Sequence, residues 1–351
     1  MTKRIAIACQ GGGLNVAFAA GALQKILEIV EKDEKKSFEI TALSGTSAGA
    51  LCAFMVWYGL LTGGPQEARE RLAGLWADFA AQQPAEQFFN QWVVNTFRLQ
   101  AQGFLPEVKF SPYSPLFEVL EKQLGFVELV GIRPEFFDYE TLLAKNAPRL
   151  ADIQQTEASV RLLIGAIEVL SGKFKAFDSK KGEVSFAAVR ASGAIPWWGI
   201  KAVEIDDGVY WDGLLSQNPP LKNFLVDTPV EEKPDEIWLI RINPQEQAEK
   251  PIAPEEIEDR RNELAGNLSL NQELDFIEKI NEFLEIKAVA RLRAFSEKYK
   301  SVAVRTIAPS LEVSDNLDTA SKLDRSPAFI KRLMADGEKQ AAALLAELAQ
   351  E

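Results

Sequence analysis

The serine at position 47 is the first residue whose surroundings could support chemistry. Ser47 lies in the motif GTSAG, between Gly45 and Gly49. The apolar run Ile40–Leu43 predicts a buried strand before the motif, and the apolar stretch Ala48–Tyr58 predicts a helix after it. A strand, a tight turn and a helix in this order form a nucleophile elbow, in which the glycines make room for the turn. The alternative is a serine that caps an ordinary helix.

The chain contains no histidine, so the usual base of a Ser-His-Asp triad is excluded. A carboxylate at a strand end is the remaining candidate. Asp212 follows the short predicted strand Val209–Trp211, and Gly213 leaves the next backbone position uncrowded. The acidic pair in the sequence DDG at 206–208 is explained by a hairpin turn. We therefore predict that Asp212 accepts the proton of Ser47, helped by a partly desolvated site.

A run of glycines between a strand and a helix supplies the third part of a candidate site. Gly11, Gly12 and Gly13 follow the apolar run Arg4–Cys9. Their backbone N–H groups can converge at a helix N-terminus, where the helix dipole favours negative charge. A dinucleotide-binding loop is the alternative, but Val16 occupies the place of its third glycine. Beside a serine elbow, the loop is better explained as an oxyanion hole.

Composition excludes several classes of partner. A net charge of -12 and a pI near 4.9 argue against nucleic acid. With no histidine, only two cysteines and no EF-hand spacing, we expect no metal and no cofactor. Cys9 and Cys52 lie in apolar surroundings and are expected to be buried, reduced thiols, which fits a cytoplasmic protein.

No apolar run approaches the roughly 18 residues of a membrane-spanning helix. The apolar stretch Ile5–Cys9 is too short for a signal peptide. The segment Lys287–Arg305 holds six basic residues and one acidic residue. Its simplest explanation is a solvated helical face, and a transient contact with a membrane surface is the alternative. The sequence does not indicate an oligomeric state.

The order of the expected elements predicts one α/β domain over residues 1–351. Its core is expected at about 4–60 and 160–245, where strands and helices alternate and predict a mostly parallel sheet. A helical insertion is expected at about 65–158, and a helical C-terminal extension at about 255–351.

Aromatic residues are concentrated in the expected insertion. Eleven of the 53 residues from 74 to 126 are aromatic, which is about double the 9% of the whole chain. The insertion either packs on the sheet or forms a cap whose apolar lining receives acyl chains. The pair Trp197-Trp198 has similar alternatives, since it could pack on the core or contact substrate or a membrane interface.

Taken together, these segments resemble the patatin-like phospholipase family, whose members use a Ser–Asp dyad and no histidine. The resemblance implies a three-layer α/β/α fold and hydrolysis of acyl esters in lipids. It also implies that Ser47 is the nucleophile, that Asp212 is its partner, and that Gly11–Gly13 form the oxyanion loop. The matching segments are QGGGLNVAFAAGAL at 10–23, GTSAG at 45–49, ASGAIP at 191–196 and DGLLSQNPP at 212–220.

The sequence departs from the family pattern at two places. Asn15 and Val16 stand where the family usually has a basic residue followed by glycine, and Leu214 stands where it usually has glycine or alanine. The first departure bears on the anion site, and so on the preference for phosphorylated head groups.

We therefore expect a serine-dependent lipid acyl hydrolase, such as a phospholipase A, a lysophospholipase or a general lipid esterase, that works through an acyl-serine intermediate. One alternative is an acyltransferase that uses the same acyl-enzyme. The other is a catalytically idle lipid-binding or regulatory protein on the same fold.

Overall fold

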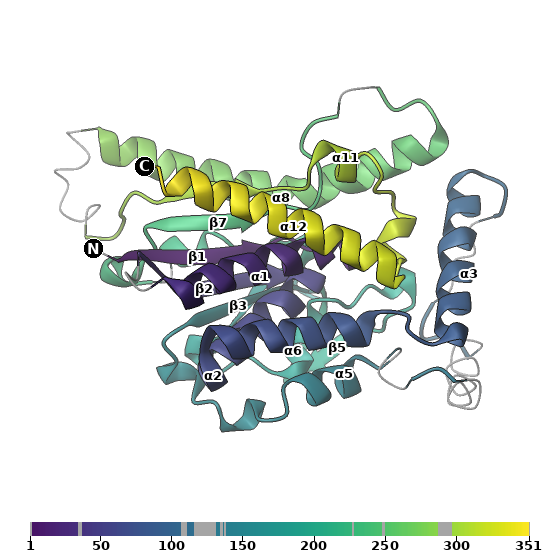
Figure 1. Ribbon diagram of the computed structural model, residues 1–351, viewed down its shortest axis with the longest axis horizontal. Coiled ribbons are helices and arrows are strands. Elements are labelled where there is room, and N and C mark those ends of the chain that lie inside the picture. The colour runs from purple at the N-terminus through teal and green to yellow at the C-terminus, as the bar shows by residue number, and fades with distance from the viewer. Residues whose placement is uncertain are drawn as a thin grey trace.

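The computed structural model describes residues 2–33, 37–106, 111–115, 131–133, 136, 138–226, 228–247, 250–286 and 297–350. Its centre is an eight-stranded mixed sheet in the order β5-β6-β3-β2-β1-β7-β8, with β4 also paired to β3 (Figure 1). The parallel strands are β1 (Lys3–Cys9), β2 (Phe38–Thr46), β3 (Arg161–Glu168), β7 (Glu236–Ile240) and β8 (Ala303–Ile307). The antiparallel strands are β4 (Phe174–Asp178), β5 (Val203–Ile205) and β6 (Gly208–Asp212).

Both faces of this sheet are covered, as the alternation along β1 shows. Ile5, Ile7 and Cys9 belong to the larger core, with residues of the helices α1 (Ala17–Lys32), α2 (Ala48–Phe79) and α12 (Pro327–Leu348). Ala6 and Ala8 point to the other face and pack in a smaller core with α7 (Asn223–Val226) and α8 (Pro254–Glu285). The prediction of a three-layer α/β/α fold with a mostly parallel sheet is therefore confirmed.

Helices cover the sheet and also occur in the insertion. Those in and around the core are α1 (Ala17–Lys32), α2 (Ala48–Phe79), α6 (Phe186–Ala191), α7 (Asn223–Val226), α8 (Pro254–Glu285), α11 (Leu311–Ser314) and α12 (Pro327–Leu348). The insertion carries α3 (Pro84–Ala101) and α5 (Tyr139–Asn146). Short 3-10 helices are η1 (Gly13–Val16), η4 (Leu150–Asp152), η5 (Gln155–Glu157), η6 (Ser179–Lys181), η7 (Pro196–Trp198), η8 (Gly213–Leu215), η9 (Val230–Glu232) and η10 (Ala320–Leu323).

The element α2 consists of two helices joined at a kink. The first runs past the predicted end at Tyr58 as far as Gly64, where the backbone is not helical (φ 81°, ψ -163°). Pro65 begins the second, which ends at Phe79. The second half of α2, from Pro65 to Phe79, leads into the segment before α3.

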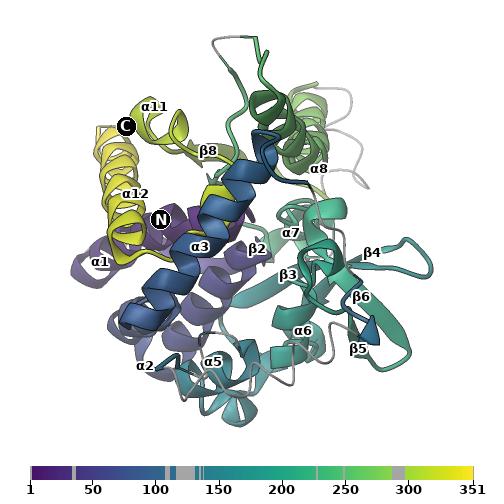
Figure 2. The same ribbon diagram turned by 90° about the vertical axis from the view of Figure 1, so that its right-hand side faces the viewer.

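Residues expected as a C-terminal extension take part in the core. Strand β8 pairs with β7 and forms one edge of the sheet, while α12 packs along α1. Helix α3 lies beyond the carboxyl ends of the parallel strands, as both ribbon views show (Figures 1 and 2). The segment from 287 to 296, which holds part of the expected basic patch, lies outside the described residues.

Two helical stretches, Gly13–Lys32 and Ala48–Phe79, are long and apolar enough to pass a length-and-hydropathy test for membrane spans. In each, 61% of the most apolar window is buried inside the protein. Both belong to the core around the sheet, and core helices commonly pass this test.

Two glycines allow α1 and α12 to approach closely. A Cβ at Gly337 would lie 1.9 Å from the carbonyl oxygen of Phe18, and a Cβ at Gly21 would lie 1.9 Å from that of Met334. A side chain at either position would therefore push the helices apart.

Gly337→Ala should lower the free energy of unfolding by about 1–3 kcal/mol, because overpacking a close helix contact forces a shift of backbone. Urea unfolding monitored by circular dichroism measures this change. Glu338→Ala, at an exposed neighbour on the same helix, is the control. Equal unfolding midpoints for Gly337→Ala and the wild type would contradict the predicted contact.

Candidate active site

The turn between β2 and α2 holds Ser47 in a strained conformation. Ser47 has φ 56° and ψ -132°, although it is not a glycine. A Cβ at Gly45 would lie 2.4 Å from Gly49 O, and one at Gly49 would lie 2.3 Å from Cys9 O. Both flanking positions therefore require glycine for lack of space.

A serine from the ASGAIP segment fixes this turn. The Ser47 N–H donates to Ser192 Oγ at 2.9 Å, and Ser192 Oγ donates to Gly165 O at 2.6 Å. These two hydrogen bonds tie the strained Ser47 to strand β3, which neighbours β2 in the sheet. The function of Ser192 was not predicted from the sequence, although the segment belongs to the resemblance.

Asp212 ends strand β6 and is buried, with 1% of its surface exposed. Its Oδ1 accepts a hydrogen bond of 2.7 Å from the Leu214 N–H. Burial raises the pKa of Asp212 to about 7, while the Ser47 hydroxyl and the Leu214 N–H act to lower it. The hydroxyl is thus close enough to influence the carboxyl. Oδ2 nevertheless has no hydrogen-bond partner of ordinary geometry among the described residues, and catalytic contacts are often long without substrate.

The loop after Asp212 packs against the elbow. A Cβ at Gly213 would lie 2.6 Å from Gly165 O and 2.9 Å from Thr46 Cγ2. Thr46 Oγ1 also donates to Gln217 O at 2.6 Å. Gly213 is therefore needed for close approach, as its place after Asp212 suggested.

The glycine loop lies on the other side of the elbow. A Cβ at Gly11 would lie 2.7 Å from Thr46 O and 2.9 Å from Ser47 Cβ. The Gly11 N–H donates to Asn218 Oδ1 at 2.7 Å, so this amide is already used. The N–H groups of Gly12 and Gly13 have no acceptor within the described chain.

Buried amide side chains hold this loop in place. Gln10 Oε1 accepts from the N–H groups of Ile242 at 2.8 Å and Asn243 at 3.0 Å, beyond the end of β7. Gln10 Nε2 donates to Asn267 Oδ1 on α8 at 2.9 Å. Gln10 and Asn218 were not predicted as site residues, although both lie in segments on which the resemblance rests. Amide residues beside a glycine loop were the available signal.

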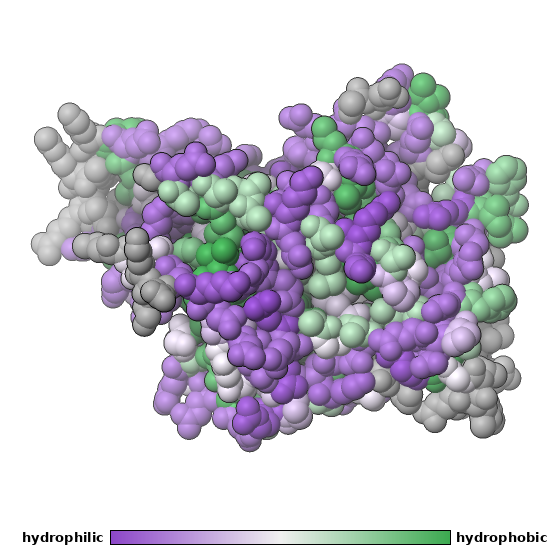
Figure 3. Space-filling view, in the orientation of Figure 1, coloured by the Kyte–Doolittle hydropathy of each residue, from purple (hydrophilic) through white to green (hydrophobic). Residues whose placement is uncertain are grey.

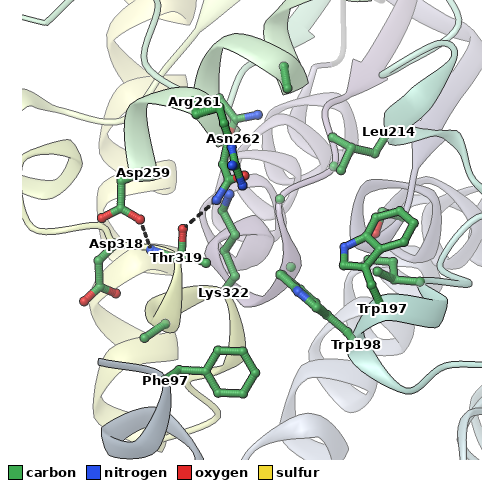
Figure 4. Close-up of a pocket in the computed structure, with 18 of the residues that line it drawn as sticks. Phe97, Trp197, Trp198, Leu214, Asp259, Arg261, Asn262, Asp318, Thr319 and Lys322 are labelled. Carbon is green, nitrogen blue, oxygen red and sulfur yellow. Dashed lines mark hydrogen bonds between the residues drawn. The ribbon is translucent and has the colours of Figure 1, made fainter. Parts of the chain in front are cut away.

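A cavity of about 840 Å³ opens over these three segments. Ser47, Asp212 and Gly11–Gly13 all line it, so the structure brings the predicted site residues together. Trp197, Trp198 and Leu214 lie on one side of the cavity and the polar side chains on the other, with Phe97 at the lower edge of the view (Figure 4). The polar side chains in this view are Asp259, Arg261, Asn262, Asp318, Thr319 and Lys322. Ile195, Leu215 and Arg98 also belong to the lining.

The tryptophan pair borders this cavity. Trp197 is 50% exposed and its ring packs edge-on against Trp211, with centroids 6.0 Å apart. Within the insertion, Phe97 lines the cavity, whereas other apolar side chains of α3 and the next residues face solvent (Figure 3). The exposed ones are Phe88, Trp92, Leu99, Phe104 and Leu105. Phe110, Phe117 and Phe126 lie outside the described residues.

The described residues contain no cluster of His, Cys, Asp and Glu that could hold a metal ion. Cys9 and Cys52 are buried free thiols away from the cavity lining. Burial raises the pKa of the Cys52 thiol to about 12, so this group stays protonated.

Because of Asp212, the free energy of unfolding should fall as pH rises. Its folded pKa of about 7 exceeds the ordinary value of 3.8, so its stabilising contribution is complete below about pH 4 and is lost through about pH 7. Asp212→Asn has no carboxyl to titrate, so it does not show this loss. The free energy of unfolding of Asp212→Asn minus that of the wild type should therefore increase by up to about 4 kcal/mol between about pH 4 and about pH 7.

Urea unfolding of both proteins at several pH values measures this difference, and Asp207→Asn reports the effect of losing one exposed carboxyl. A difference between Asp212→Asn and the wild type that stays constant with pH would show that the Asp212 carboxyl is not perturbed.

Comparison with known proteins gives similar solved structures and one family model. No curated protein matches the sequence. Two solved structures are similar: type III effector protein ExoU (14% identity, TM-score 0.34, 97% of this chain and 53% of that chain), and full-length SpcU in complex with full-length ExoU from Pseudomonas aeruginosa (15%, 0.28, 97% and 52%). The chain thus spans about half the length of these structures. A family model described as patatin-like phospholipase matches residues 7–225, the larger part of the chain. The protein therefore belongs to the patatin-like phospholipase family.

Proposed function

We propose that this protein is a lipid acyl hydrolase that uses a Ser47–Asp212 dyad. Its family supports lipid acyl hydrolysis in general. The observation that carries the dyad is the burial of Asp212, with a pKa raised to about 7, beside a serine in an elbow conformation. A carboxyl with this pKa is a far better base near neutral pH than an ordinary one.

The proposed reaction begins when ionised Asp212 accepts the proton of the Ser47 hydroxyl. Ser47 Oγ then attacks the carbonyl carbon of the ester, and the carbonyl oxygen becomes an oxyanion. The N–H groups of Gly12 and Gly13, which have no acceptor within the described chain, are the proposed donors to it. The Gly11 amide, bonded to Asn218, positions the loop.

Collapse of the tetrahedral intermediate breaks the ester C–O bond, and Asp212 returns the proton to the leaving alcohol. The acyl group then remains on Ser47. A water molecule, deprotonated by Asp212, attacks the carbonyl carbon of the acyl-serine. The bond from this carbon to Ser47 Oγ then breaks, Asp212 returns the proton to Ser47 Oγ, and the fatty acid is released. The apolar side chains of the lining, among them Phe97 and Trp198, suit the acyl chain.

A fluorophosphonate probe tests the nucleophile. Wild-type protein should be labelled, whereas Ser47→Ala should not, because the probe reacts only with an activated serine. Ser171→Ala, which changes an exposed serine, is the control and should label like the wild type. Hydrolysis of a lipid ester should fall by at least about a thousandfold in Ser47→Ala. Unchanged labelling of Ser47→Ala would remove Ser47 from the mechanism, and labelled protein that releases no fatty acid from any lipid would favour the transferase.

The dyad also predicts a pH profile. Because Asp212 must be ionised to act as base, kcat/KM should rise about tenfold per pH unit below its pKa of about 7 and level off above it. Fatty acid release, measured by mass spectrometry between about pH 5 and 9, gives this profile. A rate that is independent of pH across this range would show that no group with a pKa near neutrality is the base.

A further inference from the structure

Lys322 is a charged residue of the cavity lining that the mechanism leaves unused. Its side chain extends between the polar wall of Asp259 and Thr319 and the indole of Trp198 (Figure 4). Within the described part of the chain, its ammonium group forms no hydrogen bond and no ion pair. An unpaired cation at a partly buried position costs free energy unless a ligand compensates it.

The acidic groups around Lys322 have other partners. Asp318 pairs with Arg98 at 2.9 Å, and on α8 Glu263 pairs with Arg260 at 2.9 Å. Asp259 Oδ1 accepts from the Thr319 N–H at 2.8 Å. Burial lowers the pKa of Lys322, whereas Asp259, Glu263 and Asp318 act to raise it. These acids therefore favour the charged ammonium, and none of them forms a salt bridge with it.

The backbone of Lys322 lies directly against the glycine loop. A Cβ at Gly13 would lie 2.5 Å from Lys322 O and 2.8 Å from Lys322 Cβ. The preceding residue, Ser321, donates through Oγ to Asn15 Oδ1 at 3.0 Å. Asn15 is buried and is absent from the cavity lining. The lysine side chain therefore starts beside the proposed oxyanion donors, so an anion bound by it would lie near the reacting ester.

We propose that Lys322 binds the phosphate group of the substrate, so that the enzyme prefers acyl esters that carry a phosphate close to the ester. This inference rests on the proposed function. In a glycerophospholipid or a lysophospholipid the phosphate is separated from the acyl ester by the glycerol carbons alone. A lysine ammonium offers three donors and a point charge to phosphate oxygens. The amide of Asn262, on the same side of the cavity, is a neutral donor for a further oxygen.

Two substrates with the same acyl chain, 1-oleoyl lysophosphatidic acid and 1-oleoylglycerol, test the proposal. The ratio of their kcat/KM values reports the preference for phosphate. Lys322→Gln should lower this ratio by about 10- to 100-fold, as expected for one hydrogen bond to a charged group. Lys322→Arg, which keeps the charge, should restore most of it. Lys331→Gln, the same change at an exposed position of α12, should leave the ratio unchanged.

A purely structural contribution would give a different result. Equal losses on both substrates in Lys322→Gln and in Lys322→Arg would overturn the proposal, and so would an unchanged ratio. Absence of hydrolysis of both substrates by wild-type protein, together with absence of fluorophosphonate labelling, would refute the proposed function itself. The two failures are therefore distinguishable.

A competition experiment separates a lipid head group from free phosphate. Glycerol 3-phosphate should inhibit hydrolysis of 1-oleoylglycerol more strongly than inorganic phosphate does, and Lys322→Gln should weaken both effects. Inhibition by inorganic phosphate alone, with an unchanged substrate ratio, would assign the site to free phosphate and overturn selection of the head group.

Discussion

Close backbone approach at glycine positions is the constraint on which this site depends. Added Cβ atoms at Gly11, Gly49 and Gly213 would each come within 3 Å of a backbone oxygen of a neighbouring segment, namely Thr46 O, Cys9 O and Gly165 O. A Cβ at Gly45 would come equally close to Gly49 O within the elbow itself. The turns after β1, β2 and β6 are thereby packed closely against one another and against β3. Only this packing places a carboxyl from β6 beside a hydroxyl from β2, since the two strands are separated in the sheet by β3. The chemistry proposed here needs that proximity because no histidine is present to span a larger gap.

The same packing lowers the stability of the folded protein at the site. Ser47 holds a positive φ that costs of the order of 1–3 kcal/mol, and the Asp212 carboxyl is buried with an oxygen that lacks a partner among the described residues. Burial of apolar surface on both faces of the sheet offsets these costs, and α12 adds to it through its glycine contact with α1. The far C-terminal helix thus supports a strained turn near the N-terminus.

Local sequence was sufficient for most of the elements and for selecting Ser47 and Asp212, which line one cavity in the structure, because each motif is short and its chemistry follows from its neighbours. The strands, the elbow and the hairpin before Asp212 required only apolar runs, glycines and a turn signal. Contacts between distant segments could not be predicted in this way. Three such contacts depend on the tertiary fold. They are the pairing of β8 with β7, the hydrogen bond between Asn15 and Ser321, and the hydrogen bond between Gly11 and Asn218. The first half of α2 runs past its predicted end at Tyr58 because the residues up to the break at Gly64 remain helical.

The cavity joins two parts of the chain that contribute different chemistry. The segment matched by the family, residues 7–225, supplies the serine, the carboxyl, the glycine loop and most of the apolar wall. Most of the polar wall comes from α8 and from the segment around η10. Position 15, where the resemblance anticipates a basic residue, carries an amide that anchors this second segment. If Lys322 supplies the charge instead, the cation reaches the glycine loop from a segment more than three hundred residues away in the sequence. Acyl transfer and the choice of head group would then be set by different regions, so that substrate preference can change without disturbing the dyad.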